Sequence, residues 1–238
     1  MKMMAIYKRE FKAYFHSMIG CLIVAFLVAF TGIYFMAYNL YSGYPFFSYV
    51  LRAINYVLII AVPLLTMRSF AEERRNKTDQ LLLCAPVKLS QVVLGKYLAM
   101  VSVFAIPCAV FCFYPLVIKS FGTAYLKVDY AAILMFFLLG CVYIAIGMFL
   151  SSLTESQIIA AITTFGTLMI VYLWGGLVSF LPDIDFLVNI LEKLDIVSVF
   201  ENIVSEQMFP LGGLIYYLSL IGVFVFLTMQ SIQKRRWS

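Results

Sequence analysis

Long uncharged, apolar stretches alternate with short charged segments along the chain. A helix needs about 20 apolar residues to cross the hydrocarbon core of a membrane. Five stretches pass this test, at residues 18–38, 97–118, 130–153, 158–180 and 211–230. A sixth, residues 47–67, is long enough if Arg52 packs against protein or reaches back to the membrane surface. The pattern therefore predicts an all-α membrane protein with six transmembrane helices.

The composition supports a membrane location and argues against a soluble domain. Hydrophobic residues make up 64% of the chain and charged residues only 12%. A soluble fold needs a polar shell around its core, whereas lipid accepts apolar side chains on the outside of a helix. The net charge of +5 does not indicate nucleic-acid binding, because that requires a basic face on a soluble fold.

Basic residues in the short loops predict the orientation in the membrane. With both termini cytoplasmic, the inner side holds Lys2, Lys8, Arg9, Lys12, Arg68, Arg74, Arg75, Lys77, Lys88, Lys96, Lys234, Arg235 and Arg236. The outer side keeps Arg52, Lys119, Lys127 and Lys193. This asymmetry predicts a multi-pass protein of the bacterial cytoplasmic (inner) membrane with both ends inside.

Two segments outside the spans have the apolar spacing of surface helices. Residues 1–17 place apolar side chains opposite basic ones, which predicts an interfacial "elbow" helix in contact with membrane lipids. Residues 182–209 predict an external amphipathic helix. Its apolar positions are Leu187, Ile190, Leu191 and Leu194.

The cytoplasmic segment at residues 68–96 is too short for a domain. Ser69 and Glu72 have the spacing of a capping box, which predicts a short helix there. A solvated, salt-bridged loop would explain the charges, but the apolar residues Phe70 and Leu82 favour docking against a partner.

The predicted spans lack the side chains that catalysis or metal binding inside a membrane would require. We find no paired acids, histidine ligands or Ser/Lys dyad, so no catalytic, cofactor-binding or metal site is predicted. Cys108 and Cys112 share a helix face, but we interpret them as packing residues. The chain also lacks a Walker A motif, so ATP hydrolysis would need another subunit.

The order of these elements, together with three motifs, resembles the ABC-2 family of ABC transporter permeases. MRSFAEERRNKTDQLLLCAPV at residues 67–87, with VVLGKYLA at 92–99, resembles the family's coupling-helix region and the start of its third span. SSLTESQIIAA at 151–161 resembles its turn between spans four and five, and YYLSLIGVFVFLT resembles its last span. Within the family, these motifs resemble the gliding-motility (Gld) permeases, with the nitrous-oxide-reductase maturation permeases as a neighbouring branch. Lys77 stands before Thr78 where the family usually has glycine, so the local turn differs.

The resemblance implies a permease subunit that couples ATP hydrolysis by a separate ATPase to export or other movement of a substrate. It implies two copies of the ATPase, which would hold the ATP and Mg. It also implies a second permease, forming a homo- or heterodimer, and allows for an extracytoplasmic accessory protein. The alternative is a membrane anchor or force-transmitting subunit that moves no solute. The residues expected to couple to the ATPase are Ser69, Phe70, Glu72, Glu73, Arg74, Arg75, Thr78, Leu82 and Glu155, with Glu73 first among them.

In this family the second and fifth spans line the path between the two permeases. The corresponding residues here are Arg52, Asn55, Ala160, Thr163, Thr164 and Thr167. The small and weakly polar stripe of span five fits close helix packing or a lipid-like conduit. Arg52 fits contact with lipid phosphates or with an anionic substrate or loop.

Overall fold

The structure is a computed structural model that describes residues 2–75, 88–121, 125–178, 195–206 and 211–236. Every regular element in these residues is helical. Six of the helices are long and apolar enough to cross a membrane. The predicted all-α architecture with six candidate membrane-spanning helices is therefore confirmed for the part of the chain described.

The six candidate spans lie close to the predicted ranges. They are α2 (Ile19–Phe35, continued by the π-helical turn η1, Met36–Tyr41), α3 (Ser48–Thr66), α6 (Leu89–Phe111), α8 (Leu126–Leu153), α9 (Gln157–Val178) and α12 (Leu211–Arg236). Four shorter helices flank them, namely α1 (Lys2–His16), α4 (Ala71–Arg75), α7 (Tyr114–Phe121) and α11 (Ile196–Glu206). The largest shift concerns α6, which begins at Leu89 although its expected start was Tyr97.

Helix α8 lies at the centre of the bundle and packs against α3, α6, α9, α11 and α12. Two glycines on α8 allow its closest approaches. A β-carbon on Gly140 would clash with the ring of Phe104 on α6, and one on Gly147 would clash with Thr66 on α3. Small residues let helix backbones approach in this way, and this close packing is a main source of helix association in lipid.

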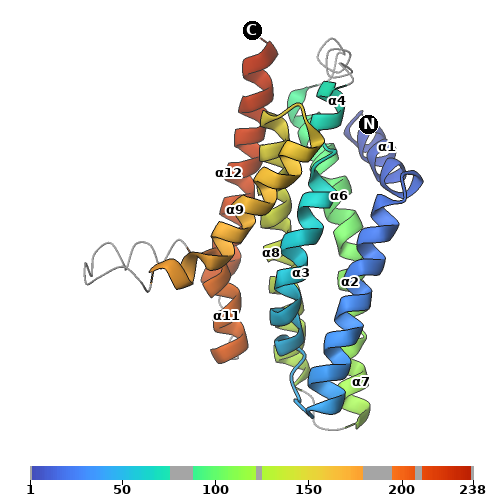
Figure 1. Cartoon of the computed structure of the whole chain (residues 1–238), viewed down its shortest axis with the longest axis vertical. Helices are drawn as coiled ribbons and strands as arrows, with labels where there is room; N and C mark the ends of the chain where they lie inside the picture. The colour runs from blue at the N-terminus through green and yellow to red at the C-terminus, as the bar shows by residue number, and fades with distance from the viewer. Residues whose placement is uncertain (1, 76–87, 122–124, 179–194, 207–210, 237–238) are drawn as a thin grey trace.

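The two ends of the bundle differ in structure (Figure 1). One end carries α1, α4 and the C-terminal turn of α12, so both termini lie on the same side, while the opposite end carries η1 and α7. Helix α1 packs along α6 and turns into α2 at Met18, whose φ of 56° is left-handed. The predicted elbow helix is therefore present as α1.

The predicted external amphipathic segment is described in part. Leu187, Ile190, Leu191 and Leu194 lie outside the described residues. The described part of the segment, residues 195–206, contains α11, whose Ile196, Val197 and Phe200 are buried and whose Phe200 ring meets Phe136 of α8 edge-on. This part packs into the bundle, because its apolar face finds protein rather than lipid.

Candidate coupling site at one end of the helix bundle

Helix α4 is a single helical turn that follows directly on α3, and its first backbone amides are satisfied by another helix. The amides of Phe70 and Ala71 both donate to the Ser151 hydroxyl oxygen, each at 3.3 Å. The Ser151 hydroxyl in turn lies 3.3 Å from the Met67 carbonyl, to which it donates. Hydroxyl oxygens cap helix starts in this way, so α8 supplies the cap of α4.

The predicted capping box of Ser69 and Glu72 is therefore wrong. Ser69 is buried, and its hydroxyl has no hydrogen-bond partner. The Glu72 side chain forms an ion pair with Arg68 at 3.8 Å instead of reaching back to the helix start. The end of α8 lies directly against this turn, so the Ser151 hydroxyl caps the start of α4 in place of the Ser69 hydroxyl.

A buried lysine joins α4 to two other helices. The Lys96 side chain on α6 is only 3% exposed, and its ammonium lies 2.8 Å from a carboxylate oxygen of Glu73. The same ammonium donates to the Ser69 carbonyl at 2.7 Å and stands 5.0 Å from the centre of the Phe70 ring. A buried charge of this kind is tolerated only when it is paired and hydrogen-bonded.

The elbow helix α1 contributes the second carboxylate and another cation. Glu10 lies 3.6 Å from the Lys96 ammonium and 2.7 Å from the Arg9 guanidinium, which also approaches Glu73 at 3.4 Å. The hydrogen bond from Arg9 to Glu10 raises the pKa of the Arg9 guanidinium above its ordinary value. Two acids and two bases thus alternate between α1, α4 and α6, and we call Arg9, Glu10, Glu73 and Lys96 the charge cluster.

Some of the predicted coupling residues in α4 and the preceding turn are buried within this chain, and others are exposed. Ser69, Phe70 and Arg74 are buried, and the Glu73 side chain is only 17% exposed within the charge cluster. Arg75 is exposed, and Glu72 is about two-fifths exposed. Glu73 therefore directs its carboxylate to Lys96 inside this chain and is not a water-exposed contact residue.

Phe70 also needs correction as a docking anchor. Its ring is buried inside this chain against the Lys96 ammonium, so it is not presented to a partner. Thr78 and Leu82 lie outside the described residues. Whether any of these side chains couples to an ATPase stays a prediction.

The turn between α8 and α9 lies at the same end as α4. Ser151 caps α4, and the next residue, Ser152, shares a hydrogen bond of 3.1 Å with Ser231 on α12. Glu155, in the turn itself, is exposed. The two segments predicted to meet an ATPase are therefore connected to each other through Ser151.

Arg52 and Asn55, predicted to line the path or the permease interface, have different surroundings in the structure. Arg52 forms an ion pair with Glu201 of α11 at 3.2 Å, and both side chains are partly exposed. Asn55, about one turn further along α3, is buried. The sequence analysis considers lipid phosphates and an anionic substrate or loop as partners of Arg52. In the structure, its partner is a carboxylate of the same chain.

The threonines of α9 are satisfied within their own helix. The hydroxyls of Thr163, Thr164 and Thr167 donate to carbonyls one turn earlier at 2.7 to 2.8 Å. Ala160 and Thr164 are buried in the bundle, while Thr163 is exposed. This arrangement fits helix packing better than a polar conduit, because the hydroxyl protons are already used.

The sequence analysis counts Lys96 only among the basic residues that orient the chain in the membrane. It misses the role of Lys96 in pairing with Glu10 and Glu73. A signal was present, because Lys96 stands alone in an apolar run, between Gly95 and Tyr97. A lone charge in such a run indicates a paired charge elsewhere. The sequence could not show which acids pair with it, since Glu10 and Glu73 are distant along the chain.

Comparison with known proteins agrees with this architecture. The family model described as "ABC-2 family transporter protein" matches residues 38–229, which is most of the chain and includes four of the six candidate spans in full. No curated protein matches the sequence. Because the family match covers far more than half of the chain, and the helices have the order expected of such a permease, the chain belongs to the ABC-2 family of transporter proteins.

Proposed function

We propose that this chain is the permease subunit of an ATP-driven transporter of the bacterial inner membrane, moved by two copies of a separate ABC ATPase. Family membership supports the role of a permease component of an ABC transporter. The ATPase would hold the ATP and Mg. Within the family, the coupling-region motif at residues 67–87 supports the gliding-motility branch as our proposal for this chain.

The observation that carries the proposal is the attachment of α4 to the bundle. The Ser151 cap joins α4 to α8, and the charge cluster joins it to α1 and α6. A flexible loop would absorb a push from a partner, whereas a helix held by these two sets of contacts passes the push to the spans. Movement of α4 would therefore move α8, which touches most of the other helices.

The contact with the ATPase would lie on the side of α4 that faces away from this chain. Arg75 is exposed there, and Glu155 is exposed in the neighbouring α8–α9 turn. The inward residues Phe70, Glu73 and Arg74 would transmit the force, not make the contact. This divides the predicted coupling residues into an outer contact set and an inner transmission set.

A second permease, identical or different, would pack against the open faces of α3 and α9. The apolar residues Tyr56 and Ile60 of α3 and Ile162, Phe165 and Leu173 of α9 are exposed in the single chain. The ring of Tyr56 meets that of Tyr172, so these two helices form one continuous face. Lipid would cover such a face equally well, and a cross-link between Ile162→Cys positions of two copies would distinguish a homodimer from a lipid-facing surface.

The test uses the ATPase that co-purifies with the wild-type chain from its native membrane. We expect Arg75→Glu with Glu155→Arg to weaken retention of the ATPase about tenfold, equivalent to about 1.4 kcal/mol, without lowering the unfolding temperature. Lys127→Glu changes an exposed charge at the opposite end and serves as the control. Equal retention in all three proteins would show that this end does not couple to the ATPase.

The same preparation separates transport from a purely mechanical role. A transporter subunit should support ATP hydrolysis that a transported compound stimulates, whereas an anchor should support hydrolysis that no compound stimulates. Purification of the wild-type chain without any ATPase would contradict both.

A further inference from the structure

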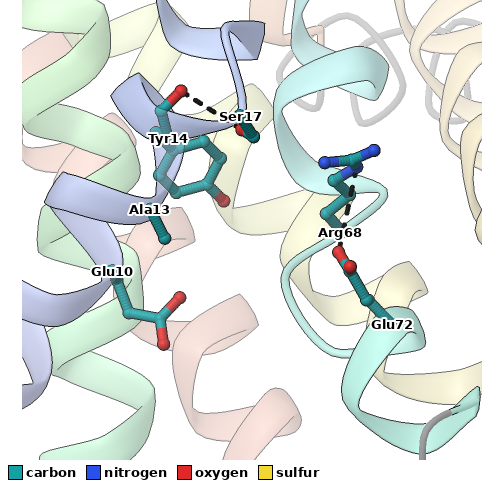
Figure 2. Close-up of a pocket in the computed structure, with 6 residues that line it drawn as sticks. All are labelled: Glu10, Ala13, Tyr14, Ser17, Arg68 and Glu72. Carbon is teal, nitrogen blue, oxygen red and sulfur yellow. Dashed lines mark hydrogen bonds and ion pairs between the residues drawn. The ribbon is translucent and has the colours of Figure 1, made fainter.

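A small cavity opens between the elbow helix and the turn that joins α3 to α4 (Figure 2). Its volume is about 150 Å³, and it is lined by Glu10, Ala13, Tyr14, Ser17, Arg68 and Glu72. The first four residues form one wall and the last two form the other. A single water needs about 10 to 15 Å³ of such space, so the cavity can hold a larger polar group.

The charged groups that line the cavity are only partly matched by the protein. The Arg68 side chain is 37% exposed, and the 3.8 Å between its Nε atom and the Glu72 carboxylate is long for an ion pair. Glu10 supplies a second carboxylate on the opposite wall. The cavity thus offers a guanidinium that can donate and two carboxylates that can accept.

The remaining polar groups of the wall are already used. The Tyr14 hydroxyl donates to the Leu65 carbonyl at 3.2 Å, and the Ser17 hydroxyl donates to the Tyr14 carbonyl at 3.2 Å. Recognition therefore rests on Arg68 as donor and on Glu10 and Glu72 as acceptors.

This combination favours a ligand that carries both signs of charge. A simple anion would meet Arg68 but would be repelled by two carboxylates. A simple cation would meet the carboxylates but would be repelled by the Arg68 guanidinium. A primary ammonium joined to a phosphate satisfies both walls, with the phosphate accepting from Arg68 and the ammonium donating to the carboxylates.

The position of the cavity indicates where such a group would come from. Arg68 follows directly on the candidate span α3, and Ser17 directly precedes the candidate span α2. Residues at the ends of spans, beside an interfacial helix, lie at the level of the lipid headgroups. We propose that this cavity binds the headgroup of a membrane phospholipid bearing a primary ammonium, of the phosphatidylethanolamine type.

The consequence for the molecule would be a lipid that joins the elbow helix to α4. Glu10 also belongs to the charge cluster, and Glu72 lies on α4, so a bound headgroup would bridge the same two elements that Lys96 connects. The bound lipid would stabilise the arrangement of α1 against α4.

The experiment titrates the purified full-length chain in detergent with three lipids of identical acyl chains and follows the unfolding temperature. Phosphatidylethanolamine offers both groups, phosphatidylcholine lacks the N–H donors, and phosphatidylglycerol lacks the ammonium. We expect an apparent Kd for phosphatidylethanolamine about tenfold below the other two, the size expected for charge-assisted hydrogen bonds. Equal affinity for the three lipids would overturn the proposal.

Substitutions at the cavity test whether the preference for phosphatidylethanolamine arises there. Arg68→Gln and Glu72→Gln should each reduce the preference to less than about twofold, because each removes one half of the recognition. Lys12→Gln removes an exposed charge from the same elbow helix but outside the cavity, and should keep the preference. If Arg68→Gln does not fold, Glu72→Gln decides, since its side chain is partly exposed and its loss should be tolerated.

A soluble headgroup distinguishes a lipid from a free metabolite. Glycerophosphoethanolamine presents the same ammonium and phosphate without acyl chains, so we expect it to bind far more weakly than the lipid. Binding as tight as that of the lipid would overturn the assignment to a membrane lipid. Retention of the lipid preference in both cavity variants would overturn the site itself.

Discussion

Lys96 shows how one side chain determines the arrangement of three segments that are distant in the sequence. Its ammonium reaches Glu73 of α4, Glu10 of α1 and the carbonyl of Ser69. Moving an ion out of water costs several kcal/mol, so the lysine is stable here only while these partners surround it. The position of α4 therefore depends on the charge balance and not only on apolar packing.

The first prediction concerns loss of that balance. We expect Lys96→Met to lower the free energy of unfolding by about 3 to 5 kcal/mol, because Glu73 would remain buried without its nearest cation. The measurement is the unfolding midpoint of the purified chain. Lys88→Met removes an exposed lysine just before α6 and serves as the control. Equal midpoints for the two variants would contradict a structural role for Lys96.

A double substitution separates charge balance from packing. Replacing Lys96 and Glu73 together by methionine removes both charges, so we expect a smaller loss than for Lys96→Met alone. The same reasoning applies to Glu73→Arg. That substitution would place a third cation beside Lys96 and Arg9, so it should destabilise the fold and not act on a partner alone.

A second prediction concerns the opposite end of the bundle, where α3 begins. The amide of Phe47 donates to the carboxylate of Asp129 at 2.8 Å, so α8 caps α3 across the fold. We expect Asp129→Ala to cost about 1 to 2 kcal/mol of unfolding free energy, measured by thermal unfolding. Asp129→Asn keeps an acceptor oxygen and should cost less. Equal losses would show that the hydrogen bond is not what stabilises this end.

At the scale of elements, the contact between α8 and its neighbours depends on missing side chains. Gly147→Ala would push a methyl group into Thr66, so we expect a loss of about 1 to 3 kcal/mol in thermal unfolding. Gly166→Ala on α9 meets nothing within 4 Å and should be neutral or slightly stabilising, because alanine favours the helix. If both variants unfold at the same temperature, close packing at Gly147 is not required.

The elements themselves could largely be predicted, because a span of about 20 apolar residues is a strong signal. The errors occurred where a tertiary contact replaced a local rule. Helix α6 begins at Leu89, before the expected Tyr97, because the charge of Lys96 is balanced by acids from other helices. Helix α4 is capped by Ser151 and not by Ser69, and no local pattern reports that contact.

At the scale of the whole molecule, the sequence could not show which helix lies in the centre. In a soluble protein the buried face is apolar and the outer face polar, so the pattern identifies the core. In lipid both faces are apolar, and the distinction disappears. Helix α8 is surrounded by protein, whereas α9 exposes Ile158, Ile162 and Ile170, although both helices have similarly apolar sequences.

The orientation of the whole bundle gives the last prediction. Helix α8 contains 28 residues, and at about 1.5 Å per residue it exceeds the roughly 30 Å hydrocarbon core. Its two ends should therefore face opposite sides of the membrane, with exposed Lys127 near one end and exposed Glu155 just beyond the other. The excess of basic residues at the end that carries both termini predicts that this end is cytoplasmic. In a variant without native cysteines, Lys127→Cys should react with an impermeant thiol reagent added to intact cells, and Glu155→Cys should react only after lysis. The reverse pattern would invert the topology, and would place α4 on the side of the membrane where no ATPase could reach it.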